Sequence, residues 1–133
     1  MTYVAAYIAT AVVFLGLDAL WLSKIALSMY RDEMGQMLKE QPNLVIAGAF
    51  YLLYVVGIVV LAIAPALAEG GWIKALLLGA VLGLVAYGTY DITNLSTLKG
   101  WSVRLALIDI AWGTALSAVS AAIGLWVVRL FNL

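Results

Sequence analysis

Long segments without charge constrain this chain more than any other feature. Residues 41–68, 75–90 and 110–128 contain no Asp, Glu, Lys or Arg. A helix needs roughly 20 apolar residues to cross the hydrocarbon layer of a membrane, so each segment predicts a transmembrane helix. Apolar residues make up 66% of the chain and charged residues 11%, against about 45–50% and about 25% in a soluble domain. A water-soluble globule is therefore excluded.

A fourth span is expected at the N-terminus, where residues 2–23 are interrupted only by Asp18. This stretch is too long and too poor in N-terminal Lys and Arg for a cleavable signal peptide. The apolar runs are continuous, unlike the alternating strands of a β-barrel. The sequence predicts an all-α fold, a single integral membrane domain over residues 1–133 that forms a four-transmembrane-helix bundle. Its spans are expected near residues 2–23, 44–64, 72–95 and 103–128.

The segment between the first two spans, residues 24–41, holds most of the charge outside the membrane. Its apolar residues have the spacing of an amphipathic helix, which predicts a short interfacial helix. A solvated extension of the first span is an equal alternative. The apolar positions are Ile25, Met29, Met34, Met37 and Leu38.

Basic residues are divided unequally between the two sides of the predicted bundle. The loops after the first and third spans carry Lys24, Arg31, Lys39, Lys99 and Arg104, and the other side carries Lys74 and Arg129. Because short cytoplasmic loops are rich in Lys and Arg, both termini are predicted to be periplasmic. Aromatic residues at the predicted cytoplasmic interface are Trp21, Tyr30 and Trp101.

The missing residue types exclude several functions. The chain has no Cys and no His, so it cannot form disulfides, thiolate or imidazole metal sites, or a Ser-His-Asp triad. Its formal net charge is zero, which removes an overall attraction to nucleic acid. No metal site, cofactor or nucleic-acid partner is expected, and no catalytic residue is assigned.

Three carboxylates lie inside the predicted spans: Asp18, Asp91 and Asp109. An ionised carboxylate at a helix centre costs roughly 2.5–3.5 kcal/mol on insertion scales. At about 1.5 Å of rise per residue, each acid lies roughly 9–12 Å inside the cytoplasmic boundary. Acids at one depth on three helices are expected to be neighbours.

Polar and aromatic residues at a similar depth complete the predicted pocket. Tyr87, Asp91 and Asn94 share one face of the third span. The first and fourth spans each contain an Asp-x-x-Trp element, Asp18 to Trp21 and Asp109 to Trp112. In both, the indole lies one helical turn from the acid. We expect a pocket that opens toward the cytoplasm and is lined by Asp18, Asp91, Asp109, Asn94, Tyr51, Tyr54, Tyr87 and Trp112.

Purely structural roles remain open for these acids. Asp91 could end the third helix, where its charge would cost little. The other two acids have basic neighbours that could neutralise them: Arg104 or Lys99 for Asp109, and Lys24 for Asp18.

Small residues predict where the helices pack closely. The third span contains Gly79-x-x-x-Gly83, and one side of the fourth carries Gly113, Ser117, Ser120 and Gly124. Four helices enclose little volume, so a homodimer is considered as the transport-competent form.

Acids clustered in a low-dielectric layer should not all be ionised, which favours proton or cation traffic. The leading hypothesis is a small membrane protein that transports a small solute together with a proton or cation. One alternative is a membrane enzyme or accessory factor acting on lipid. Another is a structural or regulatory subunit in which the polar cluster fixes helix packing. The expected partners are the lipid bilayer, an unknown small solute or lipid, and a second copy.

Four segments together resemble a known family. They are Leu17-Asp-Ala-Leu-Trp-Leu22, Phe50-Tyr-Leu-Leu-Tyr54 with Gly57, Ala86-Tyr-Gly-Thr-Tyr-Asp-Ile-Thr-Asn-Leu95 with Trp101, and Asp109-Ile-Ala-Trp-Gly113. This pattern is similar to the bacterial membrane-protein family called domain of unknown function 2177. The resemblance covers nearly the whole chain and implies a multi-pass protein of the bacterial inner membrane. It supplies no catalytic residue.

Overall fold

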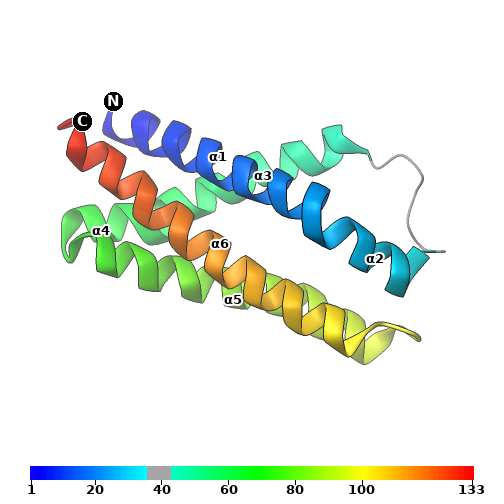
Figure 1. The fold of residues 1–133 in the computed structure, drawn as a ribbon. Helices are drawn as coiled ribbons and strands as arrows, with labels where there is room; N and C mark the ends of the chain where they lie inside the picture. The colour runs from blue at the N-terminus through cyan, green and yellow to red at the C-terminus, as the bar shows by residue number, and fades with distance from the viewer. Residues whose placement is uncertain (36–42) are drawn as a thin grey trace.

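The computed structural model describes residues 1–35 and 43–133, and these ranges contain helices and no strand (Figure 1). Four continuous helical segments are long and apolar enough to cross a membrane. The all-α, four-span prediction is confirmed. The segments are Thr2–Ala26, Leu44–Ala68, Gly71–Thr97 and Val103–Leu130.

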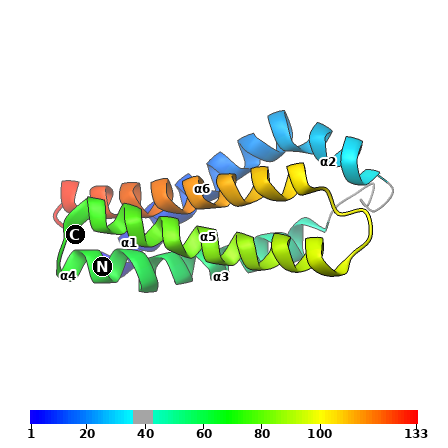
Figure 2. The same ribbon diagram turned by 90° about the horizontal axis from the view of Figure 1, so that it is seen from below.

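The first segment consists of α1 (Thr2–Trp21) and the π-helical turn η1 (Leu22–Ala26), and α2 (Leu27–Met34) follows it directly. The short helix expected after the first span is therefore α2, and it continues the span without a break. Figure 2 shows α2 alongside the N-terminal half of α6 (Val103–Leu130). Arg104 on α6 pairs with Glu33 on α2 at 3.8 Å. Met37 and Leu38, also assigned to this helix, lie outside the described residues.

The second segment consists of α3 (Leu44–Ile58), the π-helical turn η3 (Val59–Ile63) and α4 (Ala64–Ala68). The sequence predicts that the second span ends near residue 64, but the helix continues past Pro65. Proline removes one backbone donor, and the π-helical turn directly before it adjusts the local hydrogen bonding so that the helix can continue.

Two loops connect the remaining helices. Gly70 and Gly71 both have positive φ and turn the chain from α4 into α5 (Gly71–Thr97). The Ser102 side chain accepts a hydrogen bond from the Leu105 N–H at 3.0 Å and caps the start of α6. The termini meet at the Gly70 end of the bundle, where Thr2 Oγ1 donates to the Leu133 carbonyl at 2.7 Å.

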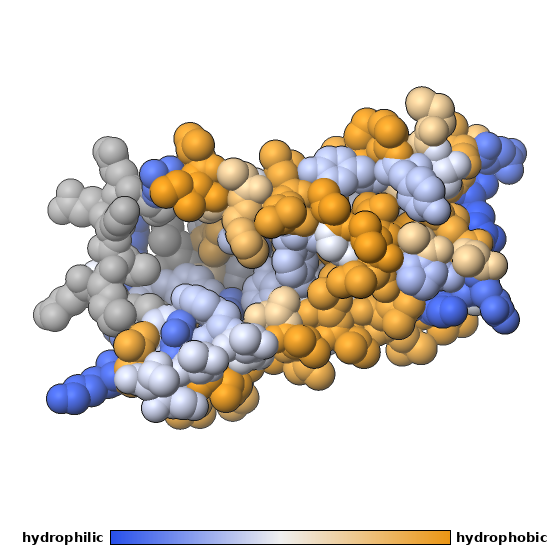
Figure 3. All heavy atoms as spheres, turned by 180° about the vertical axis from the view of Figure 1, so that it is seen from behind, coloured by the Kyte–Doolittle hydropathy of each residue, from blue (hydrophilic) through white to orange (hydrophobic). Residues whose placement is uncertain are grey.

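The face of the molecule in Figure 3 is mostly apolar along its middle, and hydrophilic residues gather toward its ends. Large Leu, Ile and Val side chains of all four segments are exposed. This arrangement fits a lipid environment, because outward apolar side chains are then in contact with hydrocarbon.

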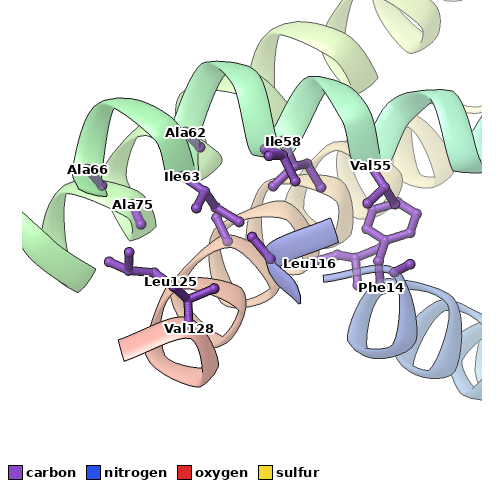
Figure 4. Packing of buried hydrophobic residues seen from close by; sticks show 14 residues of the cluster. Phe14, Val55, Ile58, Ala62, Ile63, Ala66, Ala75, Leu116, Leu125 and Val128 are labelled. Carbon is purple, nitrogen blue, oxygen red and sulfur yellow. The ribbon is translucent and has the colours of Figure 1, made fainter. Parts of the chain in front are cut away.

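The buried core fills the half of the bundle nearer the termini. Phe14 from α1 packs near Val55 from α3, and Ile63 and Leu125 continue the cluster between η3 and α6 (Figure 4). Because this half is filled by side chains, the space available for a ligand lies toward α2.

Helices α5 and α6 pack through small residues, as predicted. A Cβ atom on Gly79 would lie 2.6 Å from the Ser117 carbonyl oxygen. A Cβ on Gly83 would clash with the backbone of Gly113. The two backbones are therefore in direct contact, which only glycine allows at these positions.

We predict that Gly83→Ala destabilises the protein by about 1–3 kcal/mol, because the added methyl group must push α5 away from α6. Gly88→Ala is the matched control on the same helix, since a Cβ there has no neighbour within 4 Å. It should be neutral or stabilising by up to about 1 kcal/mol. Thermal unfolding in detergent, followed by circular dichroism, checks both. Equal melting temperatures would contradict the close contact.

Candidate functional site

A cavity of about 520 Å³ lies between the helices in the half of the bundle nearer α2. Its wall combines aromatic rings with two carboxyl groups and contains no Lys or Arg from the described residues. The lining residues are Phe14, Leu22, Tyr30, Phe50, Tyr51, Tyr54, Ala86, Tyr87, Tyr90, Asp91, Trp101, Leu105 and Asp109.

The two carboxyl groups in the wall are neighbours from adjacent helices. Asp91 on α5 is 1% exposed, and its carboxyl interacts directly with that of Asp109 on α6. Asp109 Oδ1 accepts a hydrogen bond from the Tyr30 hydroxyl at 2.9 Å. Asp91 Oδ2 is buried and has no hydrogen-bond partner among the described residues. The cavity therefore contains an acid pair with an unused acceptor.

The third acid lies beside the cavity and does not line it. Asp18 is 5% exposed, and its Oδ1 accepts a hydrogen bond from Trp112 Nε1 at 3.1 Å. The Trp112 ring stacks on Trp21 with centroids 4.5 Å apart and planes 8° from parallel. Asp18 is still close enough to interact electrostatically with Asp109. The three acids thus form one group, of which two members face the cavity.

The three tyrosines assigned to the pocket line the cavity. Tyr54 shares a hydrogen bond of 2.8 Å with Ser117. Tyr87 packs edge-on against Tyr54, with ring centroids 6.2 Å apart. Tyr51 lies next to Asp18. Asn94, by contrast, is half-buried near the end of α5 and is not part of the lining.

The structural alternatives for the acids do not match the geometry. Helix α5 continues to Thr97, so Asp91 lies inside the helix and does not end it. Arg104 pairs with Glu33, and the donor to Asp109 is Tyr30. In the part of the chain that the structure describes, neither Asp18 nor Asp109 forms a salt bridge.

Eight lining residues escaped the sequence prediction, and three of these are aromatic residues with a polar group: Tyr30, Tyr90 and Trp101. Tyr30 and Trp101 were predicted to lie at the cytoplasmic interface of the membrane. The Trp101 ring packs edge-on against the Tyr90 ring, with centroids 5.7 Å apart. The Trp101 Nε1 has no hydrogen-bond partner among the described residues. In a regular α-helix Asp18 shares a face with residue 29, and the extra residue of the π-helical turn shifts that position to Tyr30. Sequence periodicity alone cannot show this shift.

No group of three or more Asp or Glu side chains in residues 1–35 and 43–133 is arranged to hold a metal ion. The cavity can instead hold a proton between its two carboxyls or accept a donor group from a ligand.

A family model described as "Predicted membrane protein (DUF2177)" matches residues 3–126. The chain belongs to this family. No curated protein and no solved structure matches it. The match agrees with the four spans and assigns no role to the cavity.

Tyr30 lies outside the membrane-spanning segments and should titrate abnormally. Burial, followed by the nearby Asp109 carboxylate, raises the pKa of Tyr30 well above its ordinary value of about 10. A raised pKa in the folded state stabilises the protein fully below pH about 10, and this contribution is lost as the pH rises further. We predict that the folded wild type and Tyr30→Phe gain equal tyrosinate absorbance up to pH about 11.

The denatured proteins provide the control, because there the wild type should gain one tyrosinate more than Tyr30→Phe. An extra tyrosinate in the folded wild type near pH 10 would contradict the buried hydrogen bond.

Proposed function

We propose that this protein is a small membrane permease in which Asp91 and Asp109 bind a proton or cation together with a small solute. The observation that carries the proposal is the adjacent pair of carboxyls in the wall of one cavity. Acids that face the interior of a membrane bundle commonly mark ion pathways and proton relays.

The electrostatics of the cavity support this proposal. Two carboxylates side by side repel one another, and no Lys or Arg among the described residues lines the cavity. The pair is most stable when it shares a proton or binds a cation. Releasing that proton while a cationic group enters would keep the charge of the site constant, which is the basis of an exchange mechanism.

We further propose that the protein lies in the bacterial inner membrane with both termini in the periplasm. Lys24, Arg31, Lys99 and Arg104 all belong to the end of the bundle near α2, which is then cytoplasmic. In this orientation the cavity lies toward the cytoplasm.

Passage to the other side needs a rearrangement, because the half nearer the termini is filled by the core. A homodimer is the proposed transporting form, since a second copy could complete a path that four helices have little room to enclose.

The proposal predicts proton flux in liposomes that depends on the acid pair. Asp91→Asn or Asp109→Asn should each lower the flux of the reconstituted protein at least about tenfold, because the cavity wall then has a single carboxyl and no pair to share the proton. A pH-sensitive dye inside the vesicles measures the flux. Asp32→Asn is the matched control, since Asp32 is exposed on α2 and should leave the flux unchanged.

Undiminished flux in both cavity variants would overturn the proposal. Melting temperatures are measured on the same samples. If both variants lose stability and the wild type shows no flux above empty vesicles, the acid pair has a structural role only.

A second candidate function is a role in lipid chemistry. It is favoured by Phe50 and Tyr90, which line the cavity and are also exposed on the outer surface. Without His or Cys, acid–base chemistry would fall to Asp91, Asp109 and the tyrosines. This candidate predicts a changed lipid profile in a deletion strain, restored by the wild-type gene but not by Asp91→Asn. Identical profiles would exclude it.

A further inference from the structure

The lining of the cavity reaches the outer surface of the described residues at α3 and α5. These helices are joined at the Gly70 end, where η3 and α4 pack against α5, and they diverge toward the α2 end (Figure 1). Phe50 on α3 and Tyr90 on α5 line the cavity, yet they are 61% and 56% exposed. Figure 3 views the molecule from this side and shows a hollow between the two helices.

The lining changes in character from the opening inward. Phe50 and Tyr90 form an aromatic mouth, and the acid pair lies on the α5 and α6 side of the wall. A ligand that fits this gradient has an apolar body and a polar head. Since hydrocarbon surrounds the opening, such an amphiphile would already be concentrated there.

The chemistry around the acid pair selects a cationic head. Asp91 is buried, and its Oδ2 has no hydrogen-bond partner within the described residues, although the Asp109 carboxyl and the Trp101 indole lie beside it. An ammonium group that enters the cavity can donate to this oxygen and balance the charge of the acid pair. The rings of Tyr87 and Trp101 line the same cavity, and aromatic rings attract an ammonium group. An anionic head would be repelled, because no basic residue among the described ones lines the cavity.

We propose that the cavity takes up a lipophilic amine from the bilayer, with its ammonium group between Asp91 and Asp109 and its alkyl chain leaving past Phe50 and Tyr90. This names the solute class of the permease proposed above and rests on that function. A cavity of about 520 Å³ holds the head and the first part of the chain, and the remainder stays in the lipid.

The test compares three probes with the same alkyl chain: dodecylamine, dodecanol and dodecanoate. Each is added at a fixed ratio to detergent, and the melting temperature of the protein is measured. Ligand that binds only the folded state raises this temperature. Dodecylamine should raise it by several degrees in the wild type and in Asp32→Asn, and by less than a third of that shift in Asp91→Asn. An equal shift with dodecanol or dodecanoate overturns the cationic head.

The lateral route is tested by closing the opening in protein with both acids intact. Because the chain contains no Cys, Phe50→Cys and Tyr90→Cys can be combined and bridged by a cleavable bis-thiosulfonate reagent. Bridging should abolish the shift with dodecylamine, and cleavage with reductant should restore it. The two single-Cys variants treated with the same reagent are controls. A shift that persists in the bridged protein overturns entry between α3 and α5.

Comparison with the proton flux separates the two proposals. Flux that depends on Asp91 without any dodecylamine-specific shift overturns the amine and leaves the permease. A specific shift without flux overturns the permease and supports the amine site alone.

Discussion

The close contact of α5 with α6 is the interaction on which the site depends. Gly83 lies against Gly113, and the Tyr87 ring packs directly on Gly113. The helices run in opposite directions, so Asp91 lies one turn beyond Tyr87 on α5 and Asp109 lies one turn before Gly113 on α6. The register that the glycines fix therefore brings the two carboxyls together. A larger residue at the contact would shift that register and separate the acids.

The sequence predicts the spans, the glycine contact and the shared depth of the acids because each follows from a count along one helix. Hydropathy gives the spans, a four-residue spacing gives the small-residue face, and the rise per residue gives the depth. Which side chains face a neighbouring helix also depends on the rotation of each helix about its own axis. Tyr30 contacts Asp109 because a π-helical turn rotates α2 relative to α1, and no composition or spacing rule locates such a turn.

Two residues of the predicted pocket that do not line the cavity, Asn94 and Trp112, show the same limit. Asn94 shares the face of Tyr87, but it lies about two turns nearer the end of α5 and does not line the cavity. Trp112 lies one turn from Asp109, as its spacing indicates, yet its indole donates to Asp18 on another helix. The face and the depth of a residue are properties of one helix, whereas a hydrogen bond between helices also depends on the position of the second helix. That position is known only from the packing of the bundle.

The three acids differ in how the fold compensates for their burial. Trp112 donates to Asp18, and Tyr30 donates to Asp109, so each has a neutral donor that offsets part of its desolvation. Asp91 is the most buried of the three, and one of its oxygens has no donor within the described residues. A buried acceptor without a partner costs about 1–3 kcal/mol. A ligand that supplies the missing donor recovers this energy, so Asp91 is the position where binding gains most from what folding leaves unsatisfied.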